Sequence, residues 1–284
     1  MLTRREVVTS SILAAGAASA IGSAGTSASA VPSRLKQSAC RWCYKDIELE
    51  DLCAFGAKIG LQGIDLLQPH EYDIPRRYGL RCTMGYVSDG PSIADGLNRA
   101  ENHAAFEQAY QAGIPLAAKS GVPNVITFSG NRHGMSDAEG IENTVAGLNR
   151  IKGIAEDHGV TVCLELLNSK IDHPDYMADH TVWGARVMEE VNSPHVKLLF
   201  DIYHMQIMEG DLIDTIRNNI NWIGHFHTGG VPGRHELNDT QEVNWVGIAK
   251  AIADLNFAGT VAHEFVPVTA PLPALEQAVR LFAV

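Results

Sequence analysis

The sequence predicts one α/β domain, a closed (β/α)8 barrel, over residues 31–284. Eight short apolar runs alternate with amphipathic segments from residue 37 to the end of the chain. Strands separated by helices pair in parallel, and eight such units close into a barrel. Barrels of this kind take about 250 residues as one domain, which agrees with the length of this part of the chain.

The apolar runs and the amphipathic patterns give the expected elements. The expected strands are residues 38–44, 63–67, 81–87, 124–129, 161–167, 196–203, 222–228 and 260–266. The expected helices are residues 48–59, 102–120, 137–158, 181–191, 212–219, 246–255 and 272–282, and a poorly patterned stretch follows the second strand. Ser136, three residues before Glu139, predicts a capped helix start, and Gly60, Gly121 and Gly159 stand where helices should end.

An open, doubly wound sheet is the alternative architecture. Its nucleotide-binding form carries a Gly-rich turn after the first strand. This chain has Trp42-Cys43-Tyr44-Lys45 at that place, which favours the barrel.

Residues 1–30 resemble a cleaved leader of the twin-arginine type. Arg4 and Arg5 precede an Ala-rich stretch, and the small-residue triplet Ala28-Ser29-Ala30 follows. The apolar part, residues 7–21, is too short and too rich in Ser, Thr and Gly to span a bilayer. We expect export to the periplasm or the exterior with no stable membrane insertion after cleavage; the alternative is a leader that is kept as an anchor.

The charge and the cysteines exclude two classes of function. The formal net charge is −11, and such a surface repels phosphate backbones, so nucleic acid is not an expected partner. Of five cysteines, only Cys40 and Cys43 have the spacing of a redox or metal pair. They lie on an expected strand, where residues three apart face opposite sides, so we interpret them as ordinary buried thiols.

The last four expected strands each end in a residue that can bind a metal ion: Glu165, Asp201, His227 and Glu264. The carboxyl ends of barrel strands share one mouth, and alternation along each strand turns these four side chains toward the axis. Buried carboxylates without a partner lose hydration and repel one another. We therefore expect one divalent cation, and three oxygen donors with one imidazole favour Mn²⁺ or Mg²⁺ over Co²⁺ or Zn²⁺.

Two more histidines lie on the same strands. His225 is expected one layer below His227 as a buried, hydrogen-bonded residue, and His263 is expected to face the helices. Both are interpreted as structural.

The second half of the chain resembles a known superfamily. Residues 160–268 contain the segments VCLELLN, LLFDIYHMQIMEGD, IGHFHTGG and VAHEF. They are similar to the xylose-isomerase-like TIM-barrel superfamily of sugar phosphate isomerases and epimerases, and residues 200–206 most resemble the hydroxypyruvate isomerases. The resemblance implies that the four strand-end residues bind the metal and that Glu165 and Glu264 also shuttle a substrate proton. It further implies that His204 and Arg234 contact the substrate and that Asn168 lines the pocket.

This resemblance predicts a metal-dependent aldose–ketose isomerase that converts hydroxypyruvate to tartronate semialdehyde, or a related small hydroxyketone, through an enediolate. An anionic keto acid would need Arg234, or less favourably Lys170, as an anchor for its carboxylate. One departure bears on the substrate: the hydroxypyruvate isomerases carry Gln at the third ligand, whereas His227 is similar to the ketose 3-epimerases and the inositol-ketone isomerases.

Three alternatives stay open. A ketose 3-epimerase or keto-sugar isomerase would act on a neutral sugar, which suits export and the −1 charge of a divalent ion with three carboxylates. A keto-glycoside lyase would use the same enediolate to expel a leaving group. A non-catalytic sugar-binding barrel would need no proton transfer at all. The sequence is compatible with a homo-oligomer and does not decide the oligomeric state.

Overall fold

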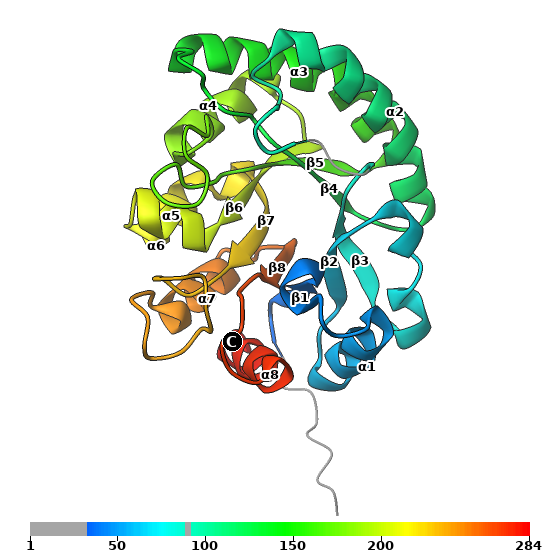
Figure 1. Ribbon diagram of the computed structural model, residues 1–284, viewed down its shortest axis with the longest axis vertical. Coiled ribbons are helices and arrows are strands. Elements are labelled where there is room, and N and C mark those ends of the chain that lie inside the picture. Colours follow the sequence, from blue (N-terminus) through cyan, green and yellow to red (C-terminus); the bar gives the residue numbers. More distant parts are fainter. Residues whose placement is uncertain (1–32, 89–91) are drawn as a thin grey trace, which may run out of the picture.

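The computed structural model describes residues 33–88 and 92–284, and the expected leader lies outside the described residues. Eight parallel strands form one closed barrel in chain order, and the α-helices lie around it (Figure 1). The strands are β1 (Lys36–Cys40), β2 (Gly63–Leu67), β3 (Arg81–Gly85), β4 (Asn124–Thr127), β5 (Thr161–Glu165), β6 (Val196–Asp201), β7 (Ile223–Thr228) and β8 (Thr260–His263). The predicted fold is confirmed.

The helices follow the strands with one exception. The α-helices are α1 (Leu49–Ile59), α2 (His103–Lys119), α3 (Asp137–His158), α4 (Thr181–Val191), α5 (Ile202–Met208), α6 (Leu212–Asn219), α7 (Trp245–Asp254) and α8 (Pro271–Leu281). The poorly patterned stretch after β2 holds two short 3-10 helices, Pro69–Glu71 and Pro75–Tyr78, and no α-helix. Each of these begins with a proline, which fits the first turn of a helix but not its interior. None of the helices in the described part of the chain is long and apolar enough to cross a membrane.

The caps that the sequence predicts are present. The Ser136 hydroxyl accepts a hydrogen bond from the Glu139 amide at the start of α3. Gly60 and Gly159 end α1 and α3 in the left-handed conformation, which glycine adopts without steric cost.

Several strands end earlier than predicted, and two of these ends bear on function. The first strand stops at Cys40, and Cys43 lies in a 3-10 helix (Arg41–Tyr44), so the expectation that both cysteines lie on one strand was wrong. The sixth strand stops at Asp201 and α5 begins at once, because the Asp201 carboxylate accepts hydrogen bonds from the Tyr203 and His204 amides. A side chain that caps these amides starts a helix where the apolar pattern suggested more strand.

The packing follows the predicted alternation along the strands. Phe200 and Phe226 are fully buried, with their rings edge to face at 5.8 Å. His263 packs on Phe282, which follows α8, and its two ring nitrogens contact the Thr228 hydroxyl and the Gln37 side-chain oxygen. His263 is therefore the structural residue that we expected. The residues that alternate with these outward-facing ones point into the barrel.

Gly113 in α2 allows the helix to pack against the chain after β3. A Cβ atom at this position would lie 2.5 Å from the Val87 carbonyl oxygen. We expect Gly113→Ala to lower the free energy of unfolding by about 1–3 kcal/mol, because overpacking outweighs the better helix propensity of alanine. The control is Gly153→Ala in α3, where a Cβ would meet nothing within 4 Å; this change should stabilise by up to about 1 kcal/mol. Urea unfolding measures both, and equal effects would contradict the packing argument.

Candidate active site

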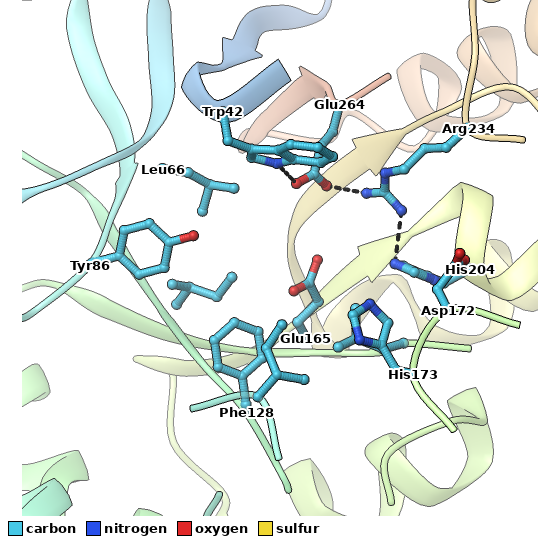
Figure 2. Close-up of a pocket in the computed structure, with 13 residues that line it drawn as sticks. Trp42, Leu66, Tyr86, Phe128, Glu165, Asp172, His173, His204, Arg234 and Glu264 are labelled. Carbon is cyan, nitrogen blue, oxygen red and sulfur yellow. Dashed lines mark hydrogen bonds and ion pairs between the residues drawn. The ribbon is translucent and has the colours of Figure 1, made fainter. Parts of the chain in front are cut away.

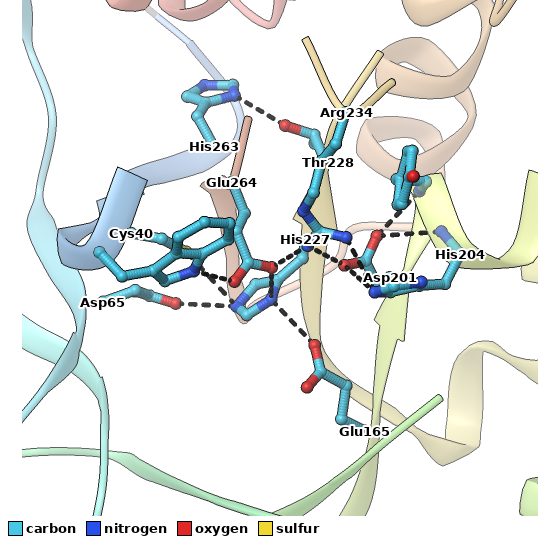
Figure 3. A network of polar contacts seen from close by, with 12 residues as sticks. Cys40, Asp65, Glu165, Asp201, His204, His227, Thr228, Arg234, His263 and Glu264 are labelled. Atoms are coloured by element: carbon cyan, nitrogen blue, oxygen red, sulfur yellow. Dashed lines mark hydrogen bonds and ion pairs between the residues drawn. The ribbon is translucent and has the colours of Figure 1, made fainter. Parts of the chain in front are cut away.

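The four strand-end residues meet at one end of the barrel axis. Ligand atoms of Glu165, Asp201, His227 and Glu264 all lie within 4.8 Å of one another, and all four residues are buried (Figure 3). Asp201 is in register with His227. Glu264 lies one residue beyond the end of β8, where its amide donates to the Thr228 carbonyl. The structure thus places the four residues as a single cluster, as the sequence predicts.

His227 presents one ring nitrogen to this cluster. Its Nδ1 atom is buried and has no hydrogen-bond partner in the described structure, although it lies 2.6 Å from a Glu264 oxygen and 3.3 Å from a Glu165 oxygen. A buried nitrogen that faces two carboxylates without hydrogen-bond geometry is suited to donate its lone pair to a cation. The residues present therefore fit a divalent metal ion.

Asp65 lies behind His227 and was not identified from the sequence. One of its oxygens is 3.3 Å from Nε2 of His227 and 2.6 Å from Nε2 of His225. The other oxygen accepts hydrogen bonds from the hydroxyls of Ser38 and Thr83. A carboxylate that holds one ring nitrogen of a ligand histidine fixes the tautomer and leaves the other nitrogen free for a metal.

The charge of Asp65 is stabilised by these neighbours. Burial alone would raise the pKa of this carboxyl, but His225 and His227 outweigh burial and hold the pKa well below its usual range. The only signal in the sequence was a lone acidic residue inside the apolar run Gly63–Leu67. His225 is the buried, hydrogen-bonded residue that we expected.

The two glutamates have different environments. Burial raises the pKa of Glu165 to about 7, and the nearby charges of Glu264 and Asp201 act in the same direction. Burial would also raise the pKa of Glu264, but Arg234 and His227 oppose it and hold this pKa well below its ordinary value. The indole N–H of Trp42 donates at 2.5 Å to Oε1 of Glu264, the oxygen that does not face His227. Sequence reasoning missed this interaction.

Arg234 lies among the carboxylates. Its Nη2 atom is 2.6 Å from a side-chain oxygen of Asp201 and also contacts Glu264. The guanidinium lies 4.7 Å from the centre of the Tyr203 ring, in a cation–π contact. The loop after β7 therefore brings a fixed positive charge to the carboxylates. Arg234 lines the cavity, and its expected contact with a substrate stays a prediction.

His204 also lines the cavity (Figure 2), and Asn168 contacts it without lining the cavity. The main-chain N–H of Asn168 is 3.2 Å from Nδ1 of His204, and the Asn168 side-chain amide is 2.7 Å from the same atom. Since a main-chain N–H can only donate, Nδ1 is the acceptor and Nε2 carries the proton. Asn168 is fully buried and is not among the residues that line the cavity, so it orients His204 and does not form part of the pocket wall.

Two donors meet where His204 and Arg234 approach each other. Nη1 of Arg234 lies 2.8 Å from Nε2 of His204, and arginine has no acceptor. Both groups line the cavity beside the Asp201 carboxylate, so an oxygen of a bound substrate can approach them together. This geometry supports the predicted substrate contact for both residues.

The cavity has one polar and one apolar wall. The residues that line it are Trp42, Leu66, Tyr86, Ile93, Ile126, Phe128, Glu165, Leu167, Asp172, His173, His204, Arg234 and Glu264. Lys170 is not among them; its ammonium group donates to the Ile207 carbonyl at 2.8 Å. The weaker expectation for a carboxylate anchor was therefore wrong, because Lys170 caps the end of α5 and does not face the site.

A family model described as a xylose isomerase-like TIM barrel matches residues 74–283. The chain belongs to this family. It is similar to a putative hydroxypyruvate isomerase of Homo sapiens, 27% identical over 58% of this chain and 61% of the relative. It is also similar to a D-psicose 3-epimerase of Ruminiclostridium cellulolyticum, 32% identical over 43% of this chain and 40% of the relative.

The alignments with three putative hydroxypyruvate isomerases span 45% to 61% of those relatives' own lengths. Among solved structures, an AP endonuclease family 2 protein from Brucella melitensis has a TM-score of 0.76 at 21% identity. That likeness covers 85% of this chain and 96% of the other, and at this identity it shows the shared fold.

The Asp65–His227 contact gives a direct test of the cluster. We expect Asp65→Asn to weaken Mn²⁺ binding roughly 10–100-fold, because the amide can present its N–H to the His227 ring and disturb its tautomer. Isothermal titration calorimetry measures the affinity. The matched control is Ser38→Ala, which removes a hydrogen bond to the other Asp65 oxygen and leaves the His227 contact in place; equal losses for both variants would contradict this role.

Proposed function

We propose that this protein is a metal-dependent isomerase of small hydroxyketones that works through an enediolate, with hydroxypyruvate as the first candidate substrate. The observation that carries the proposal is that Glu165 and Glu264, two members of the metal-competent cluster, line the same cavity. In Figure 2 their carboxyl groups reach into one space from β5 and from the end of β8. Two carboxylates so placed can act on neighbouring carbons of one substrate.

The reaction removes a proton from one carbon and adds a proton to the next, so it needs two groups of this kind. The hydroxyl-bearing carbon of hydroxypyruvate loses a proton to one glutamate, and the adjacent carbon receives a proton from the other. The hydroxyl proton moves to the former carbonyl oxygen, which gives tartronate semialdehyde. A divalent cation held by Glu165, Asp201, His227 and Glu264 would supply a Lewis acid for the carbonyl oxygen. The N–H groups of His204 and Arg234 would donate to the oxygen on which negative charge develops.

Arg234 supports an acid substrate. It is the only lysine or arginine that lines the cavity in the described part of the chain. Nη2 of Arg234 already contacts Asp201 and Glu264, so the carboxylate of a keto acid would approach its Nη1 group, beside His204.

A ketose 3-epimerase is the second candidate. It uses the same proton transfer on a single carbon, and His227 is the third-ligand type that resembles such epimerases. One similar protein carries the name D-psicose 3-epimerase, which supports a neutral ketose as the alternative substrate. Hydroxypyruvate and D-psicose are therefore assayed side by side.

Turnover in ²H₂O tests the proton transfer for both candidates. Wild type with Mn²⁺ or Mg²⁺ should convert hydroxypyruvate to tartronate semialdehyde and place solvent deuterium on the product carbon. We expect Glu165→Gln and Glu264→Gln each to lower kcat roughly 10²–10⁴-fold, because an amide cannot accept the proton. Mass spectrometry and an aldehyde assay measure both quantities.

The controls separate the alternatives. Glu107→Gln, which removes an exposed ion pair with Arg150 on the outer helices, should leave kcat unchanged. Turnover of D-psicose alone would move the assignment to the epimerases, and a product lighter than the substrate would indicate a lyase. Full activity of both glutamine variants would contradict the mechanism.

A further inference from the structure

The wall of the cavity that faces the polar site is built mainly from the first half of the barrel. Two of its residues lie on strands, Leu66 on β2 and Ile126 on β4. The other three lie in the chain just after a strand: Tyr86 after β3, Phe128 after β4 and Leu167 after β5. In Figure 2, Leu66 lies near Tyr86 on one side, and Arg234 and His204 lie on the other. A substrate held by the polar wall therefore turns its far end toward Leu66.

Leu66 reaches the cavity through an irregular strand. Its φ angle is 59°, in the left-handed region that a bulky side chain rarely adopts. The pairing of β2 with β3 shifts register between Ile64 and Asp65 and again between Asp65 and Leu67. Irregularities of this kind occur next to active sites, where they re-aim a side chain.

The irregularity brings two consecutive side chains to one site. In a regular strand Asp65 and Leu66 would point to opposite faces. Here Asp65 contacts His225 and His227 inside the barrel, and Leu66 lines the cavity with only 6% of its surface exposed. The backbone thus adopts a disfavoured conformation where an apolar side chain faces the substrate space.

We propose that Leu66 is a specificity-determining residue that limits the length of the substrate. The inference rests on the proposed function, and it gives a role to the end of the cavity that lies away from Arg234 and His204. Leu66 lines this end of the cavity, and its apolar side chain offers no hydrogen bond to the hydroxyls that a longer ketose would bring there. Three- and four-carbon hydroxyketones are therefore favoured over six-carbon ketoses.

Shortening Leu66 tests this assignment. The measurement is kcat/KM for D-psicose divided by kcat/KM for hydroxypyruvate or D-erythrulose, whichever wild type converts. We expect Leu66→Ala and Leu66→Gly to raise this ratio roughly 10-fold or more, since a few methylene groups in a pocket discriminate by this order. The matched control is Leu67→Ala, which removes the same atoms from a fully buried residue of β2 that does not line the cavity; its ratio should stay at the wild-type value.

The Tm of the variants tests the backbone conformation at position 66 independently of activity. At position 66, glycine should give a higher Tm than alanine, because only glycine adopts the left-handed conformation freely. At position 67 the order should be reversed, because glycine costs entropy in an ordinary strand. Alanine more stable than glycine at both positions would overturn the conformational part of the proposal.

The possible failures are distinguishable. An active wild type whose substrate ratio stays unchanged in both Leu66 variants overturns the assignment of Leu66 and leaves the proposed function standing. A wild type that converts none of the three substrates in the presence of Mn²⁺ or Mg²⁺ overturns the proposed function, and the assignment of Leu66 with it.

Discussion

Three carboxylates are buried close together at the mouth of the barrel, and the surrounding structure compensates their charge. Burying one carboxylate costs several kcal/mol even after relaxation, and neighbouring carboxylates repel each other. Arg234 contacts two of the three, and His227 faces two of them. A divalent cation at this point would complete the compensation, which is why the cluster is understood best as a metal site.

Residues around the cluster hold its members, and His204 beside them, in position. Asp65 holds the far nitrogen of His227, and the Trp42 indole holds one oxygen of Glu264. Asn168 orients His204, whose proton then faces the cavity together with Arg234. Each contact reaches the site from a different strand or loop, so the closed barrel is what allows them to converge.

The two halves of the barrel supply mainly different parts of the site. The strands from β5 onward and the loops after them carry the groups that can bind a metal and move a proton. β2 to β4 and the chain after them form most of the apolar wall, with Leu66 aimed into the cavity by the irregularity in β2. The two sets of groups meet on β2, where Asp65 contacts His227 and the next residue, Leu66, lines the cavity.

The sequence predicted the barrel and the grouping of the four strand-end residues because both follow from periodicity along the chain. Alternation fixes which side of a strand a residue faces, and chain order fixes the sequence of strands. The sequence did not reveal α5, whose start depends on the Asp201 cap, nor the role of Asp65. It also gave no sign of Trp42 or Leu66, since a ring that meets a carboxylate 222 residues away and a local shift of register are properties of the packed structure.

The central claim is that Glu165, Asp201, His227 and Glu264 bind one divalent ion. Anomalous scattering from crystals of the full-length protein grown with Mn²⁺ measures this most directly. The account predicts a single strong peak within coordination distance of the three carboxylates and Nδ1 of His227. A peak bonded to the alternative set of Asp65 and His225, or no peak while Arg234 still bridges Asp201 and Glu264, would contradict it.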